Sequence, residues 1–256
     1  MKVCIFCGKS VKMTKEDAWP KWLVKLLRKN PKEKVPLREF HHNRPEVTRH
    51  TTDEVIRIGG FCTSCNSGWM SALEKQAQPI LTPMILGNPE TLSTKEQFIV
   101  ASWLTKCAIV FMGQYPKEDN FFDSLDRLHF MRTVSPFDAT NIWLARYAAS
   151  DDLRGVTDHT TFLATAKGGG SLKYHVHTMA FGFLVLQIVS VKRLELMPRS
   201  LGVELKNVIN LSWNDLTVRI WPPSLQPVHW PPQLSFDDGE RDLRFFAKRF
   251  GPIKKR

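Results

Sequence analysis

The pattern of apolar and polar residues divides the chain into a mainly helical first half and a strand-rich second half. Apolar residues recur every three to four positions in four segments, which predicts helices at residues 20–30, 66–78, 93–112 and 120–131. Beyond these, β-branched and aromatic runs bounded by turn residues predict strands at residues 142–147, 160–166, 174–188 and 216–221. Consecutive strands with short turns favour an antiparallel sheet packed on the preceding helices, so the predicted fold class is α+β.

Local signals refine this outline at three places. Ser93 is followed three residues later by Glu96, the pattern of a capping box at a helix start. Three prolines interrupt the helical pattern at residues 78–89, where we expect a connector. The polar stretch before the second predicted helix favours a hairpin, with residues 47–49 pairing with residues 55–58 across a Thr-Thr-Asp turn.

The length of 256 residues suits a small domain followed by a larger one with its own core. We place the boundary in the proline-rich connector, which gives a domain of residues 1–80 and an α+β domain of residues 81–256. We expect the second domain to supply substrate contacts or to bind a protein partner.

The charge of the chain indicates what it binds. Hydrophobic residues make up 43% of the chain, as in ordinary globular proteins, but the formal net charge is +11. A basic surface of this size most often faces nucleic acid and less often an anionic membrane. The first predicted helix begins a run rich in basic residues, four of which are Lys21, Lys25, Arg28 and Lys29. A solvated helix face explains part of this run, and its excess favours contact with phosphate groups.

The sequence predicts a protein of the reducing cytoplasm. No apolar run is as long as a membrane span, and the first residues carry a cysteine motif in place of a signal peptide. We therefore expect no membrane partner.

Two pairs of cysteines carry the clearest chemistry. Cys4 and Cys7 form one Cys-x-x-Cys motif, and Cys62 and Cys65 form a second. At this spacing a tight turn directs both sulfurs at one ion, and two such turns complete a four-thiolate shell, which favours structural zinc with iron as the competing metal. The fifth cysteine, Cys107, lies in an apolar helical stretch and is expected to be buried.

Histidines in the second half offer a weaker signal. His175 and His177 alternate on one face of a predicted strand and could bind a metal together with His159. A half-exposed strand face is the simpler interpretation, because no carboxylate is spaced to join them.

The N-terminal residues also resemble a known family. The Cys-x-x-Cys motif at the start, the segment from Thr14 through Glu16 to Pro20, and the run Cys-x-x-Cys-Asn-x-Gly-Trp-Met-Ser-x-Leu-Glu from Cys62 to Glu74 resemble bacterial or phage HNH endonucleases of the treble-clef, ββα-metal type. The resemblance covers about residues 1–80 and implies divalent-metal-dependent hydrolysis of phosphodiester bonds, in DNA above all.

Site residues follow from this resemblance position by position. Glu16 takes the place of the acidic metal ligand and Asn66 the place on the helix that completes a Mg²⁺ or Mn²⁺ site. Asp17 stands where the family has its histidine general base. With an ordinary pKa near 4, a carboxylate is a poorer base at neutral pH than an imidazole.

Three interpretations of this substitution stay open. Asp17 can act as base or second metal ligand, since two carboxylates and an amide suit a hard divalent ion. One of His41, His42 and His50 can supply the missing imidazole. Alternatively, the site is inactive, Asn66 is only a helix cap, and the protein is a zinc-containing nucleic-acid-binding or assembly subunit.

Other enzyme classes receive less support from the sequence. It has no Gly-rich phosphate loop after a strand, no Gly-x-Ser-x-Gly turn and no Cys–His pair in a triad-like context.

Overall fold

The protein was analysed as a computed structural model. It describes residues 3–27, 35–39, 47–51, 57–113, 115, 120–148, 156–166, 170–193, 215–236 and 246. In these residues the fold is a mixture of helices and antiparallel sheets, which confirms the predicted α+β class.

The N-terminal part consists of short strands and one short helix. Strand β1 (Met13–Asp17) pairs antiparallel with β4 (Arg57–Cys62), and β2 (Val35–Glu39) pairs with β3 (Val47–Thr51). Helix α1 (Lys21–Leu27) follows β1.

The predicted hairpin of residues 47–49 with residues 55–58 is therefore wrong. The strand at residues 47–51 pairs with an earlier strand, and Ile58 in β4 pairs with Glu16 in β1. The cysteine motifs bring the start of the chain beside β4, so that Cys62 faces Met13 in the strand register. Turn signals report only local pairing and could not reveal this partner.

The second cysteine motif leads into a helical layer. A π-helical turn, η1 (Cys65–Met70), runs into α2 (Ser71–Ile85). Helix α3 (Thr94–Met112) begins at the predicted capping box, in which the Ser93 N–H donates to the Glu96 carboxylate at 2.8 Å. Helix α4 (Ser124–Thr133) starts later than predicted because Asp123 caps it through its own capping box.

The proline-rich stretch is not a connector over its whole length. Helix α2 includes Pro79 and Pro83 and continues to Ile85, so the boundary placed at residue 80 falls inside this helix. The apolar side chains of Leu81 and Met84 are fully buried. Their burial offsets the hydrogen bonds that the prolines remove from the helix.

The five-stranded sheet has the order β10-β6-β9-β8-β7, and every neighbouring pair is antiparallel. The strands are β6 (Thr140–Arg146), β7 (Val156–Ala166), β8 (Gly170–Phe181), β9 (Leu184–Arg193) and β10 (Thr217–Trp221). A two-stranded sheet of β5 (Glu90–Leu92) and β11 (Val228–Trp230) lies beside it.

The single strand predicted at residues 174–188 is instead a hairpin of β8 and β9. Its turn contains Gly182, which has a φ of +54°. A Cβ at this position would approach the carbonyl oxygen of Ile85 to 2.3 Å, so a glycine is required at the turn.

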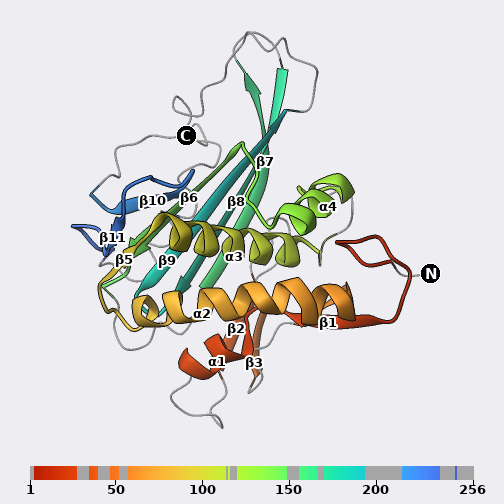
Figure 1. The fold of residues 1–256 in the computed structure, drawn as a ribbon, viewed down its shortest axis with the longest axis horizontal. Coiled ribbons are helices and arrows are strands. Elements are labelled where there is room, and N and C mark those ends of the chain that lie inside the picture. Colours follow the sequence, from red (N-terminus) through yellow and green to blue (C-terminus); the bar gives the residue numbers. More distant parts are fainter. Residues whose placement is uncertain are drawn as a thin grey trace.

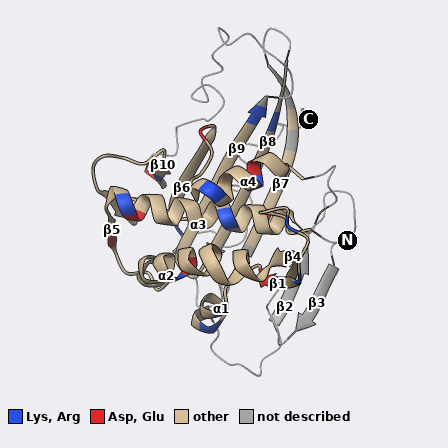
Figure 2. Ribbon diagram, turned by 45° about the vertical axis from the view of Figure 1, so that its right-hand side comes forward, with Lys and Arg blue, Asp and Glu red and all other residues tan. Residues whose placement is uncertain are grey.

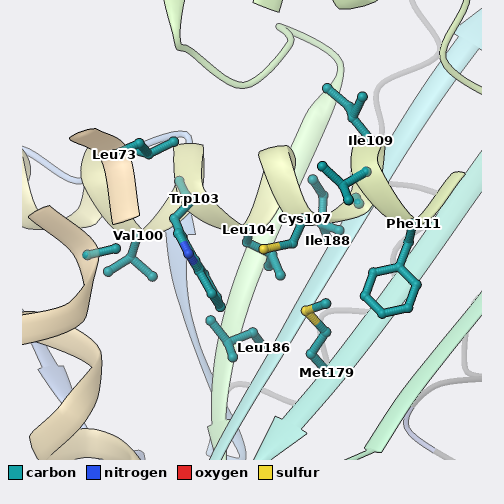
Figure 3. Packing of buried hydrophobic residues seen from close by; sticks show 14 of the residues in the cluster. Leu73, Val100, Trp103, Leu104, Cys107, Ile109, Phe111, Met179, Leu186 and Ile188 are labelled. Carbon is teal, nitrogen blue, oxygen red and sulfur yellow. The ribbon is translucent and has the colours of Figure 1, made fainter. Parts of the chain in front are cut away.

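The helical layer covers one face of the sheet, with α3 lying across the strands and α2 running alongside α3 (Figure 1). Figure 3 shows Trp103, Leu104 and Cys107 of α3 among side chains of the sheet, including Leu186 and Ile188. One buried apolar cluster extends from Cys4 to Trp230 and thus joins the N-terminal strands, the helices and the sheet. No helix in the described part of the chain combines the length and apolar character needed to cross a membrane.

Candidate metal centre

The structure brings the four predicted cysteines together. The sulfurs of Cys4, Cys7, Cys62 and Cys65 all lie within 4.8 Å of one another. The Sγ atoms of Cys7 and Cys62 are 3.7 Å apart. Four sulfurs at about 2.3 Å from a tetrahedral zinc ion would be about 3.8 Å apart, so the spacing is compatible with a zinc site. Within the described residues this is the one group of three or more Cys, His, Asp or Glu side chains with converging ligand atoms.

Two glycines shape the turns that hold these sulfurs. Gly8 has a φ of +69°, and its N–H donates to the Cys4 carbonyl at 2.9 Å, which closes the first turn. Gly60 has a φ of +106°, and a Cβ there would lie 3.0 Å from the side chain of Ile5. The Ile5 N–H donates to the Gly60 carbonyl at 2.9 Å, which joins the first turn to β4.

The protein environment assists ionisation at one of the four thiols. Burial raises the pKa of Cys4, but hydrogen bonds from the backbone N–H groups of Cys7, Cys62 and Phe6 outweigh burial and lower the pKa to about 7. Burial raises the pKa values of Cys7 and Cys65. Four thiolates this close therefore need a cation to hold them together.

Helix α4 supports the centre in a way that the sequence did not predict. The Arg127 Nε donates to the Ile5 carbonyl at 3.0 Å, between the first two cysteines, and its Nη1 donates to the Phe122 carbonyl at 2.7 Å. The Sδ of Met131 lies 3.9 Å from the Sγ of Cys65. The contacts of Arg127 with Ile5 and of Met131 with Cys65 connect residues more than 60 positions apart, and no sequence motif predicts them.

Asn66 connects the start of η1 to β1. Its amide Nδ2 donates to the Thr14 Oγ1 at 2.9 Å and to the Lys15 carbonyl at 3.1 Å. Asn66 therefore does not cap its helix, and the residue at the N-cap position is Ser64. The strand that carries Glu16 and the helix that carries Asn66 are hydrogen-bonded directly to each other.

Glu16 lies in a buried ion cluster. Its Oε1 accepts a hydrogen bond from the Lys106 Nζ at 3.2 Å, and the same Nζ lies 2.5 Å from the Glu74 Oε1. The side chain of Lys106 is 1% exposed and that of Glu16 is 9% exposed. Burial raises the pKa of Glu16, while the Lys106 ammonium opposes that shift.

The partner Lys106 was missed by sequence reasoning. It lies 90 positions after Glu16 in the middle of α3, where its neighbours Thr105 and Cys107 are also buried. A lone lysine inside a continuously apolar helix is a signal for a buried acidic partner, because an unpaired ammonium in a core is too costly to be retained.

The other predicted site residues are more accessible. Asp17 ends β1, and its Oδ1 lies 3.5 Å from the Nε of Arg57 across the strand pair. Lys21 and Lys25 are exposed on α1, and Figure 2 shows lysine in blue on this helix. Arg28, Lys29, His41 and His42 lie outside the described residues, and for His50 only the backbone in β3 is described.

The expectation of a half-exposed histidine face on β8 is wrong. His175 and His177 are both fully buried, and burial lowers the pKa of each. The helical layer covers this face, as the contact of Phe111 in α3 with the His177 ring shows. Cys107 is buried, as predicted.

Comparison of the chain with protein-family models, with curated proteins and with solved structures gave no match. The interpretation of the site therefore rests on its residues and their arrangement.

Proposed function

We propose that this protein is a divalent-metal-dependent nuclease in which a zinc ion organises the catalytic residues. The observation that carries the proposal is the hydrogen bonding of Asn66 to β1 beside Glu16 and Asp17. These three residues belong to sequence segments about 50 positions apart, and they lie on adjoining elements next to the four-cysteine centre. In this proposal β1, β4 and the η1–α2 helix form a ββα unit of the treble-clef type.

The metals have separate roles in the proposal. Zinc is favoured over iron at the thiolates as a purely structural ion, since four soft sulfur ligands in a tetrahedron suit zinc and it has no redox chemistry. Glu16 and the Oδ1 of Asn66 are proposed ligands of Mg²⁺ or Mn²⁺, for which a carboxylate and an amide oxygen are suitable donors. A hard ion bound there would stabilise charge on a phosphate group.

Asp17 has the remaining role of base or second ligand. Its side chain is 19% exposed, so it can reach a water molecule at the surface. Its Oδ1 lies 3.5 Å from the Nε of Arg57, so the carboxylate stands at the strand end beside a cationic side chain. Lys21 and Lys25 on the next helix, together with Arg28 and Lys29, are the proposed phosphate contacts. A reducing cytoplasm is the proposed location, since two Cys-x-x-Cys motifs with metal-ligand spacing are typical of such a compartment.

The test is metal-dependent nicking of supercoiled plasmid, single-stranded DNA and RNA by the purified zinc-containing protein. We expect nicking with Mg²⁺ or Mn²⁺ and a loss of about tenfold or more in Asp17→Asn. Asp138→Asn is the matched control, because Asp138 is an exposed carboxylate in the turn before β6. Equal activity in both variants would overturn the assignment of Asp17.

A second function is favoured by the buried ion pair of Glu16. Because the Lys106 ammonium already neutralises this carboxylate, the module can bind nucleic acid, or join a protein assembly through residues 81–256, without cutting. Salt-dependent binding of DNA or RNA with no nicking under any metal would select this function. A protein that neither nicks nor binds nucleic acid would exclude both nucleic-acid functions and leave only the role in a protein assembly.

A further inference from the structure

Three histidines lie together on the face of the sheet that the helices cover. His159 of β7 faces His177 of β8 across the strand pair, and His175 is two residues from His177 on the same face. Their ring centres form a nearly equilateral triangle, with sides of 5.8, 6.0 and 6.4 Å. This cluster is separate from the four cysteines and plays no part in the proposed nuclease chemistry.

Two ring nitrogens in this cluster have no hydrogen-bond partner among the residues that the structure describes. These are the Nε2 of His175 and the Nδ1 of His177, and both side chains are fully buried. Buried polar atoms are nearly always satisfied by protein, water or a bound ion, so each of these nitrogens requires an explanation.

The other nitrogen of each ring is hydrogen-bonded to a threonine of β7. The Nδ1 of His175 lies 3.1 Å from the Oγ1 of Thr161, and the Nε2 of His177 lies 2.7 Å from the Oγ1 of Thr157. When each threonine oxygen accepts from the ring N–H, the unpaired nitrogen carries a free lone pair. Histidine ligands of metals are held in this way, by a hydrogen bond from the nitrogen that does not bind the ion.

The surroundings keep the two rings neutral and away from bulk solvent. Burial, with a smaller effect of the neighbouring His159 ring, lowers the pKa of His175 to about 3 and that of His177 well below its ordinary value. Phe121 and Phe122 pack on the His175 ring, with ring centres 5.4 and 5.3 Å away. The nearby Lys173 directs its ammonium to the Asn120 carbonyl.

We propose that His159, His175 and His177 form a second metal site, for Zn²⁺ or another imidazole-binding transition metal ion. Three histidines from two neighbouring strands, at positions i, i+2 and directly across, can occupy three corners of a tetrahedron and leave the fourth for water. Imidazole nitrogens favour such an ion over Mg²⁺ or Ca²⁺, which prefer oxygen ligands.

Binding requires a modest contraction of the cluster. Imidazoles on one zinc ion, with Zn–N bonds of about 2.1 Å, would place their ring centres about 5.3 Å apart. The observed distances are longer, and the ring nitrogens do not converge as the four sulfurs do. His159 is the half-buried member of the cluster, whereas His175 and His177 are fully buried, so the proposed contraction is assigned to a movement of the His159 side chain.

The experiment measures zinc per chain after saturation with zinc and removal of unbound metal. We expect two zinc ions per chain in the wild-type protein and one in His159→Asn, which retains the thiolate site as an internal sign that the chain is folded. His229→Asn is the matched control, since the His229 side chain is hydrogen-bonded to Thr91 outside the cluster. This variant should retain two zinc ions per chain. Co²⁺ added to protein that already holds one zinc ion should bind to the His159→Asn variant at least about tenfold more weakly than to the wild-type protein.

One zinc ion per chain in the wild-type protein, with no Co²⁺ binding at the remaining site, would overturn the proposal. In that case water, rather than a metal, satisfies the two nitrogens. A second ion that persists unchanged in both His159→Asn and His175→Asn would also overturn it, because the ion would then lie elsewhere.

Discussion

Replacing Lys106 by methionine should test whether the buried ion cluster holds β1 in place. The substitution conserves the apolar stem and removes the ammonium, which lies 3.2 Å from the Glu16 Oε1 and 2.5 Å from the Glu74 Oε1. Glu16 would then be a buried carboxylate without a counterion. Breaking a buried pair by removing one partner costs about 3–5 kcal/mol of unfolding free energy, and we expect a loss in this range at neutral pH.

The loss should depend on pH in a defined direction. Burial already raises the pKa of Glu16, and Lys106 limits that rise. Without the lysine the pKa rises further, so the folded variant binds a proton at a pH where the unfolded chain does not. A group with a raised folded-state pKa stabilises the protein at low pH and loses that contribution as pH rises. The loss of unfolding free energy relative to wild type should therefore be largest at about pH 8 and decrease toward about pH 5.

Urea unfolding at several pH values measures this difference. Lys75→Met, on the exposed face of α2, is the control and should change the unfolding free energy by about 0.5 kcal/mol or less. The double variant Glu16→Gln/Lys106→Met should recover part of the loss, because no buried charge at Glu16 is left uncompensated. A loss below about 1 kcal/mol for Lys106→Met, or one independent of pH, would refute the argument.

Three other predictions concern the metal centre and the histidines. Chelation of zinc, or Cys62→Ser, should lower the melting temperature and release one metal ion, whereas Cys107→Ala should retain it; calorimetry with metal analysis checks both. Arg127→Met should cost about 1–3 kcal/mol and speed zinc release to a chelator, because two carbonyl partners are lost, while the exposed Arg132→Met should do neither. The two buried histidines of β8 have lowered pKa values, so as the pH falls the unfolded chain binds protons that the folded chain does not. At pH values under about 6.5, the unfolding free energy measured with urea should therefore decrease by up to about 1.4 kcal/mol per histidine for each pH unit. A flat profile down to about pH 5 would contradict this last prediction.

The cysteine cluster could be predicted from the sequence because its information is local. Two residues between cysteines set the geometry of each turn, and the number of thiolates sets the metal. The capping box at Ser93 is equally local, and it appears in the structure as predicted. The alternating runs of the second half likewise predicted strands that pair antiparallel.

The errors arose where distant residues decide the outcome. The pairing of β4 with β1 depends on the metal motifs joining segments about 55 positions apart. Helix α2 continues past its prolines because Leu81 and Met84 have a core to enter, and this core is supplied largely by later elements. Likewise, the burial of His175 and His177 depends on α3 and the phenylalanines before α4, which alternation along β8 cannot reveal.

The ion cluster shows a limit of reasoning by residue type. The motif predicts Glu16 as a metal ligand from its position, and the structure adds a buried lysine at 3.2 Å as its partner. A sequence motif identifies which acidic residue is special, but it does not identify the cation that the residue binds.

X-ray absorption at the zinc edge, on protein carrying one zinc ion per chain, tests the central claim most directly. The account predicts four sulfur neighbours at about 2.3 Å and no nitrogen or oxygen in the first shell, with loss of one sulfur in Cys62→Ser. A first shell of nitrogen and oxygen, or a protein that folds fully without metal and with its thiols free, would contradict the account.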